Sequence, residues 1–180
     1  GSDSVTGGNV AAGYGYYNSF TNGISNLALV FPENLSGGVI SSFSTGILTS
    51  HEAGHSFGLR HHPGDIDTTA KTQGIMNSTS HGYEDAIWSF LPDDNGTLQD
   101  DMVMLSNSLN GFGYRIDDFG GSISNATPLV NNNGTLTGSG IIGSTNDVDM
   151  FLFTTLGANG VKIDVHGSEI GQNLDVVIDF

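Results

Sequence analysis

The chain has 180 residues, 37% of them hydrophobic, so its length allows one full domain with a real core and part of a second domain. Four basic against 19 acidic residues give a formal net charge of −15, and such a surface repels nucleic-acid phosphates and anionic lipid, which excludes both as expected partners. No apolar run reaches membrane-spanning length, no signal peptide is visible in this sequence, and the lack of cysteine does not identify a redox compartment.

Two strands and a helix are predicted in the first part of the chain. Residues 9–17 alternate small and aromatic side chains, and residues 26–31 form a short apolar run that ends at a proline; both patterns indicate strands. From about Val39 the apolar positions follow a helical period. The apolar face of this helix continues into His51, so we expect the face that anchors the helix also to carry the functional side chains.

Three histidines, a glutamate and a glycine follow at fixed spacing: His51, Glu52, His55, Gly58 and His61. Residues four apart share one helix face, so the first two histidines can bind one cation, while Glu52 lies about 100° round the helix, beside the metal without binding it. Glycine tolerates the left-handed conformation that ends a helix, so Gly58 lets the chain turn and bring His61 back to the ion. Three ligands leave a fourth position for water, and the pattern therefore predicts a catalytic zinc with Glu52 as general base.

This motif, His-Glu-x-x-His-x-x-Gly-x-x-His over residues 51–61, resembles the zinc signature of the metzincin metallopeptidases. The Gly-Ile-Met-Asn run at residues 74–77 resembles the Met-turn of the same family. The resemblance implies a zinc endopeptidase with an α+β catalytic domain: a sheet, the zinc-binding active-site helix, the Met-turn and a C-terminal helix. It also implies that Met76 packs beneath the metal as an apolar floor, and that the three histidines and Glu52 form the active site.

The residues around the motif leave several roles open. Ser78 stands where astacin-like and serralysin-like members carry a zinc-binding tyrosine, so a fifth ligand from this position is excluded. Tyr83 or His81 could approach the site from the following loop, but such residues more often form a surface or a wall. We expect His62 to be solvated or to contact a ligand, and an exchange of roles between His61 and His62 remains an alternative.

Further elements are predicted after the Met-turn. Residues 77–90 are expected to be irregular and to form one wall of the cleft. Residues 97–100 fit a capping box, and apolar spacing from Leu98 to Leu109 predicts an amphipathic helix that ends at the following Asn-Gly. In the family resemblance this helix closes a catalytic domain at 1–116. Because such domains usually place more structure before the zinc helix, we expect an N-terminal portion to be missing.

The C-terminal third has a different composition. Residues 117–128 are polar and glycine-rich and are interpreted as a linker. Residues 129–180 then contain short strand-like runs separated by turn residues. Residues 117–128, followed by the Asn-Asp-Val-Asp-Met-Phe run at residues 146–151, resemble the pre-peptidase C-terminal modules of secreted bacterial proteases. The resemblance implies an incomplete all-β sandwich and a secreted, extracellular protein. The predicted strands are residues 135–142, 148–154, 161–165 and 174–180.

The predicted function is zinc-dependent hydrolysis of peptide bonds in a protein or peptide substrate, with an extended substrate pairing with residues 10–16 as an edge strand. Two alternatives remain: an adhesion or binding protein whose zinc domain is inert, and a zinc amidase acting on a non-protein substrate. Calcium is a further candidate ligand, because residues 93–95 with Asp100 and Asp101, and residues 147–149, offer clustered oxygens. Turn and helix-cap roles explain the same residues.

Overall fold

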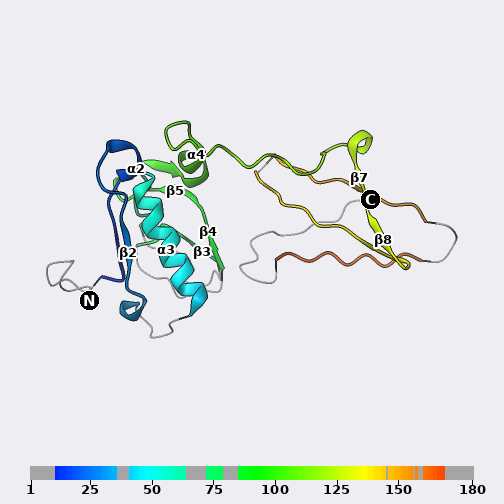
Figure 1. Ribbon diagram of the computed structural model, residues 1–180, viewed down its shortest axis with the longest axis horizontal. Helices are drawn as coiled ribbons and strands as arrows, with labels where there is room; N and C mark the ends of the chain where they lie inside the picture. The colour runs from blue at the N-terminus through cyan, green and yellow to red at the C-terminus, as the bar shows by residue number, and fades with distance from the viewer. Residues whose placement is uncertain are drawn as a thin grey trace. The chain divides into compact units, whose positions relative to one another are not determined.

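The computed structural model describes residues 11–35, 41–63, 72–78, 85–144, 146–155, 157 and 160–168 (Figure 1). The chain divides into two compact units, Gly1–Phe112 with Val165–Phe180 and Gly113–Asp164. The first unit is a small mixed arrangement of α-helices and short β-strands. In the described part of the chain, no helix combines the length and the apolar character that crossing a membrane requires.

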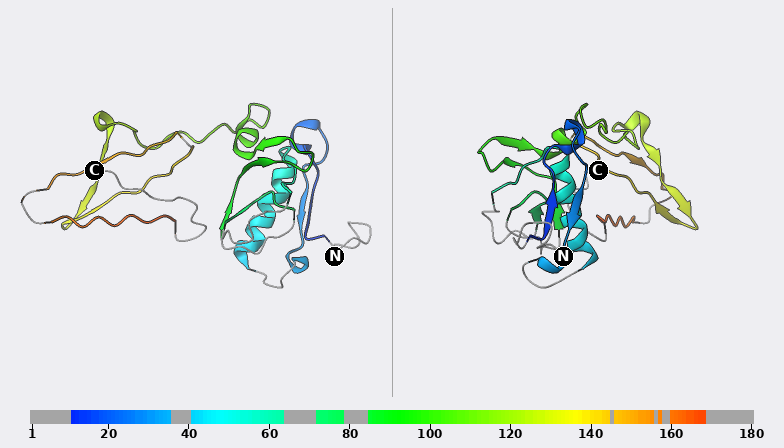
Figure 2. Two further views of the ribbon diagram at one scale, coloured as in Figure 1. Left: turned by 180° about the vertical axis from the view of Figure 1, so that it is seen from behind. Right: turned by 60° about the vertical axis from the view of Figure 1, so that its left-hand side comes forward.

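The first unit carries the candidate functional residues. Its described elements are, in chain order, β1 (Gly13–Gly15), α2 (Ser19–Asn22), β2 (Ala28–Val30), the 3-10 helix η1 (Pro32–Asn34), α3 (Ser42–Ser56), β3 (Thr72–Gly74), β4 (Asp85–Ile87), β5 (Phe90–Pro92), β6 (Leu98–Asp100) and α4 (Asp101–Ser106). The strands pair two by two, β1 with β2 and β5 with β6 antiparallel, and β3 with β4 parallel. Figures 1 and 2 show α3 running between the β1–β2 pair and the β3–β4 pair.

The helix α3 begins and ends where its sequence provides capping residues. At its start, the Ser41 hydroxyl accepts a hydrogen bond from the Ser44 N–H, and the Ser44 hydroxyl accepts one from the Ser41 N–H, each at 3.0 Å. This reciprocal capping box satisfies two main-chain donors that the first turn leaves free. At its end, Gly58 has φ of 96°, which confirms the predicted left-handed glycine that stops the helix.

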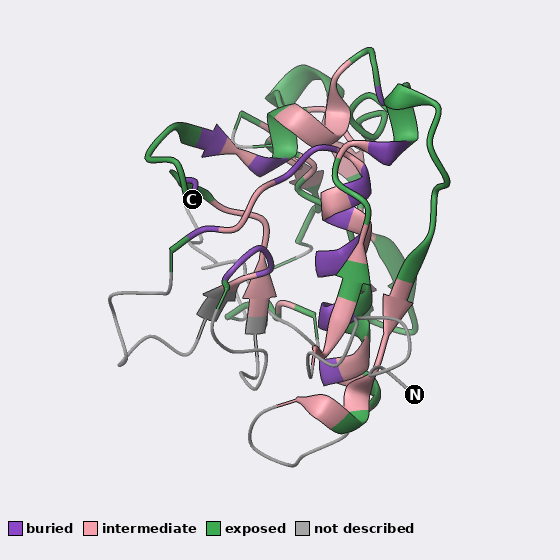
Figure 3. Ribbon diagram, turned by 90° about the vertical axis from the view of Figure 1, so that its left-hand side faces the viewer, coloured by how far each residue is buried: buried purple, intermediate pink, exposed green. Residues whose placement is uncertain are grey.

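The core of the first unit lies beside the C-terminal half of α3. Leu59, Ile75 and Met76 are buried together, and partly buried apolar side chains pack against them from β4, α4 and the residues next to β4. Figure 3 shows that buried residues gather along α3 and the chain segments beside it. The turn after α3 and the turn at residues 74–77 therefore meet in one apolar cluster, which fixes their main chains relative to the helix.

The structure corrects two predicted elements of this unit. The helix expected from Leu98 begins only at Asp101, because Leu98–Asp100 pairs with β5 as strand β6. Its N-cap is Asp100, whose carboxylate accepts a hydrogen bond from the Val103 N–H at 3.0 Å, so the predicted capping box is wrong. Residues 77–90 were expected to be irregular, but they contain β4, which pairs in parallel with β3.

The second unit contains η2 (Ile123–Asn125), β7 (Thr127–Pro128), β8 (Val130–Asn132), β9 (Thr135–Thr137) and β10 (Phe151–Leu152). Within it β8 pairs with β9 antiparallel and β7 pairs with β10 in parallel, so β7 takes up the end of the segment interpreted as a linker. Strands at residues 135–142 and 148–154 are present but shorter than expected, and residues 161–165 form no strand, contrary to the prediction. Residues 174–180 lie outside the described residues.

Candidate metal centre

Three imidazoles converge at the C-terminal half of α3. His51 and His55 project from successive turns of the helix, and His61 comes from the extended segment after Gly58. The Nε2 atom of His61 lies 3.0 Å from His55 Nε2 and 3.1 Å from His51 Nε2, and all three candidate ligand atoms lie within 4.8 Å of one another. The helix period and the left-handed turn thus bring the three histidines of the motif together.

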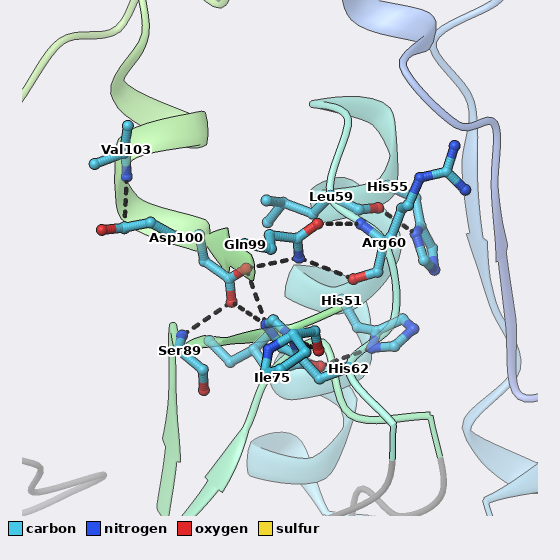
Figure 4. Close-up of polar contacts among 12 residues, drawn as sticks. His51, His55, Leu59, Arg60, His62, Ile75, Ser89, Gln99, Asp100 and Val103 are labelled. Atoms are coloured by element: carbon cyan, nitrogen blue, oxygen red, sulfur yellow. Dashed lines mark hydrogen bonds and ion pairs between the residues drawn. The ribbon is translucent and has the colours of Figure 1, made fainter. Parts of the chain in front are cut away.

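Main-chain carbonyls orient two of the rings. His51 Nδ1 lies 2.7 Å from the Ile75 carbonyl oxygen, and His55 Nδ1 lies 2.9 Å from the Leu59 carbonyl oxygen (Figure 4). Because a carbonyl only accepts hydrogen bonds, each ring donates through Nδ1 and keeps a lone pair on Nε2. Both lone pairs are directed toward the point where the three rings meet.

The three nitrogens fit a zinc ion. Zinc binds imidazole nitrogens at about 2.0–2.1 Å in a tetrahedron, which places neighbouring ligand nitrogens about 3.3 Å apart. The two Nε2 separations to His61 are close to this value. Hydrogen bonds among the three rings explain these short distances less well than a shared metal ion does. A single N–H on His61 Nε2 can donate fully to the lone pair of His51 Nε2 or to that of His55 Nε2, but not to both.

The electrostatics of His55 favour a neutral, metal-binding ring. Burial lowers the pKa of His55, the hydrogen bond to the Leu59 carbonyl raises it in part, and the neighbouring His61 lowers it further. A lowered pKa keeps this imidazole unprotonated at neutral pH, and the neutral form is the one that binds a metal.

Glu52 follows His51 in α3, and its side chain packs against strand β1. Its side chain is only 5% exposed, and a Cβ added at Gly13 would collide with its carboxyl group. A Cβ added at Gly15 would collide with the Glu52 carbonyl oxygen and would lie 3.2 Å from Oε2. The sequence pattern predicted only a strand at these glycines. Glycines at alternate positions lie on one strand face and leave space there, and this spacing was the sequence feature that could have predicted close packing of a large side chain against the strand.

Burial raises the pKa of Glu52 from its usual 4.5 to about 7. The cause is desolvation, which penalises the charged carboxylate. A carboxyl group that exchanges its proton near neutral pH can accept a proton from water and return it to a leaving group. The position on α3 directly after His51 and the raised pKa both suit a general base.

The turn that contains Met76 supports α3 from the core side. The Asn77 N–H donates to the Gly74 carbonyl at 3.1 Å, which closes a tight turn over residues 74–77. Met76 is fully buried, and a Cβ at Gly54 would lie only 2.7 Å from its sulfur. Close packing of Met76 against the helix therefore depends on a glycine between the two helical histidines.

His62 is buried, so of its two predicted roles, a solvated ring or a ring in contact with a ligand, the solvated one is wrong. Its side chain is directed away from the three converging rings, with Nδ1 3.0 Å from the Pro92 carbonyl oxygen and Nε2 3.2 Å from Asp101 Oδ1. His61, and not His62, is the third member of the converging group. Two other residues considered for the site, His81 and Tyr83, lie outside the described residues.

The acidic residues considered for calcium have two kinds of surroundings. In the first unit, Asp93 accepts hydrogen bonds from the main-chain N–H groups of residues 95 and 97, Asp100 caps α4, and Asp101 contacts His62. These carboxylates therefore serve a turn, a helix cap and a side-chain hydrogen bond. In the second unit, carboxylate oxygens of Asp117, Asp147 and Asp149 lie within 4.8 Å of one another. Burial, followed by the neighbouring carboxylates, raises the pKa of Asp149.

Comparison of the chain with protein-family models, with curated proteins and with solved structures found no match. Function must therefore be inferred from the geometry and chemistry of the site itself.

Proposed function

We propose that the chain is a zinc-dependent endopeptidase with a metzincin-like catalytic domain. The observation that carries this proposal is the convergence of the His51, His55 and His61 Nε2 atoms, two of them from the helix that also carries the buried Glu52. A zinc ion held by three imidazoles would keep one coordination position for water, and this arrangement distinguishes catalytic from structural zinc sites.

Each side chain has a defined task in the proposed hydrolysis. His51, His55 and His61 would hold the zinc ion, which would supply Lewis acidity and lower the pKa of a bound water molecule toward about 7. Glu52 accepts a proton from the attacking water and then returns it to the amine nitrogen that leaves when the peptide bond breaks. The Ile75 and Leu59 carbonyls keep the His51 and His55 rings in the tautomer that binds metal through Nε2.

Strand β1 supports a peptide as the substrate. Among the described strands, β1 has a partner on one side only, namely β2, so its other edge presents main-chain donors and acceptors. An extended peptide can pair with such an edge in the manner of an added strand. The same strand contacts Glu52 through Gly13 and Gly15, so a peptide paired with β1 would run close to the proposed base.

The proposal is tested by separating metal binding from turnover. The zinc-loaded protein should cleave members of a diverse peptide library, and Glu52→Gln should retain stoichiometric zinc while losing cleavage. His55→Ala should lose zinc, as measured by atomic absorption. Glu33→Gln is the matched control, because Glu33 is exposed in η1 and should leave both zinc content and turnover unchanged.

Two results would contradict the proposal. Cleavage that persists in Glu52→Gln would remove the assigned base. A zinc-replete wild-type protein that leaves all peptides intact but hydrolyses a non-protein amide would support the amidase alternative instead.

A further inference from the structure

We propose that Gln99 and Asp101 are positioning residues for the third zinc ligand: they fasten the main chain on both sides of His61 and so set the affinity for zinc. The inference rests on the zinc site of the proposed function, and it concerns residues from the β6–α4 junction that the motif does not include. Figure 4 shows this junction against the segment that leads from α3.

Gln99 fastens the residue before the ligand. Its Oε1 accepts a hydrogen bond from the Arg60 N–H at 2.9 Å, and its Nε2 donates to the Arg60 carbonyl at 3.0 Å. One amide side chain thus pairs with both main-chain groups of Arg60 in the way that a neighbouring strand would. Gln99 is 5% exposed, so water does not readily replace these bonds when they are lost.

Asp101 fastens the residue after the ligand. It is fully buried, and its carboxylate lies 3.2 Å from His62 Nε2. The same carboxylate accepts hydrogen bonds from Gln99 Nε2 and from the Ser89 N–H, each at 2.9 Å. The other ring nitrogen of His62 faces the Pro92 carbonyl oxygen at 3.0 Å, so the ring is held from both ends.

The main chain of His62 is held as well. Its N–H donates to the Met76 carbonyl at 2.8 Å, and its carbonyl accepts from the Ser78 N–H at 3.2 Å. His61 thus lies between two residues that are held by hydrogen bonds, and its own ring is directed to the metal site. The residues that hold Arg60 and His62 are distant in sequence, because Gln99 and Asp101 each lie 39 positions after their partner.

Displacement of this segment would affect two ligands together. The Leu59 carbonyl, directly before Arg60, holds the ring of His55, while His61 follows Arg60. Zinc requires its nitrogens at about 2.0–2.1 Å, so a shift of a few tenths of an ångström weakens binding. Loss of outer contacts that orient ligands commonly costs about 10–100-fold in metal affinity.

The test measures zinc affinity in the absence of substrate. We expect Gln99→Leu, which has similar volume but no hydrogen bonds, to raise the zinc dissociation constant by about 10–100-fold in chelator competition. The absorption spectrum of the cobalt-substituted protein should shift, because the ligand geometry changes. Asp101→Asn keeps the shape of the side chain and should raise the dissociation constant in the same direction.

Asn110→Leu is the matched control. Asn110 is also buried, and its side-chain amide donates to the main-chain carbonyls of Phe57 and Met104, which lie outside the segment of residues 60–62. Its loss should lower the free energy of unfolding of the metal-free protein while changing the zinc dissociation constant by less than about 3-fold. This comparison distinguishes positioning of the ligand from a general loss of stability.

The inference is overturned if Gln99→Leu binds zinc as tightly as the wild type, or if Asn110→Leu weakens binding equally. Should Gln99→Leu not fold, the affinity of Asp101→Asn decides, and wild-type affinity there refutes the inference. A chain that binds zinc but cleaves no peptide refutes the proposed function alone. A chain that cleaves peptides while both variants keep wild-type zinc affinity refutes this inference alone.

Discussion

The burial of Glu52 predicts that the metal-free protein is more stable at neutral pH when this carboxylate is replaced by a neutral group of the same shape, as in Glu52→Gln. The pKa rise from 4.5 to about 7, at about 1.4 kcal/mol per pKa unit, corresponds to about 3 kcal/mol. This is a large share of the about 5–15 kcal/mol by which typical proteins are stable.

The sign follows from proton linkage. The folded protein retains the Glu52 proton at pH values where the unfolded chain has released it, so folding is favoured at low pH. The contribution is fully present below about pH 4.5 and is lost as the pH rises through about 7. Glu52→Gln titrates in neither state, and its advantage over the wild type should therefore grow from zero near pH 4 to about 3 kcal/mol above pH 7.5.

The assay is denaturant unfolding of chelator-treated protein at several pH values, followed by circular dichroism. Comparison of the two proteins at each pH cancels the titration of all other groups. Glu33→Gln, at an exposed site, should follow the wild type throughout. A difference between Glu52→Gln and wild type that is independent of pH, or a wild type that is the more stable protein at pH 8, would refute the account of Glu52 as a desolvated carboxyl group.

Substitutions at two glycines and one methionine test further contacts of the site. Gly13→Ala places a methyl group against the Glu52 carboxyl group, and it should lower kcat by about 100-fold with zinc content unchanged. Gly46→Ala is the control, because a methyl group there meets nothing within 4 Å and should not lower kcat. Equal effects of the two variants in a peptide-cleavage assay would contradict the assigned contact. Gly58→Ala forces a side chain into φ of 96° and should lower the free energy of unfolding by about 1–2 kcal/mol, so unchanged denaturation would argue against the left-handed turn. Met76→Ala should cost about 2–5 kcal/mol in thermal or chemical unfolding and Met76→Leu less than about 1.5 kcal/mol, an order that an exposed methionine would not produce.

The parts of the site that the sequence predicted are those set by local geometry. The fixed period of an α-helix places His51, Glu52 and His55 relative to one another, and Gly58 is the residue type that a left-handed turn requires. Such relations depend on a few consecutive residues, so they can be inferred without knowledge of the tertiary structure. The convergence of His61 with the other two rings followed from this turn.

The parts that the sequence did not predict depend on contacts between distant segments. The leucine spacing from residue 98 fits a helix, but pairing of Leu98–Asp100 with β5 takes precedence over it. His62 is polar and follows His61, so a solvated ring was one of the two expectations, yet Asp101 and Pro92 provide partners for it in the interior. In the second unit, alternation indicated strands but not their partners, and the paired segments are correspondingly short.

The two carbonyls that orient the helical histidines belong to Leu59 and Ile75, whose side chains form the apolar core with Met76. Each of these residues therefore packs its side chain in the core and orients a proposed zinc ligand with its main-chain carbonyl. The stability of the core and the affinity of the site for zinc thus depend on the same residues. Gentle warming or dilute denaturant should consequently weaken zinc binding while α3 is still intact. Bound zinc should in turn stabilise this core against unfolding.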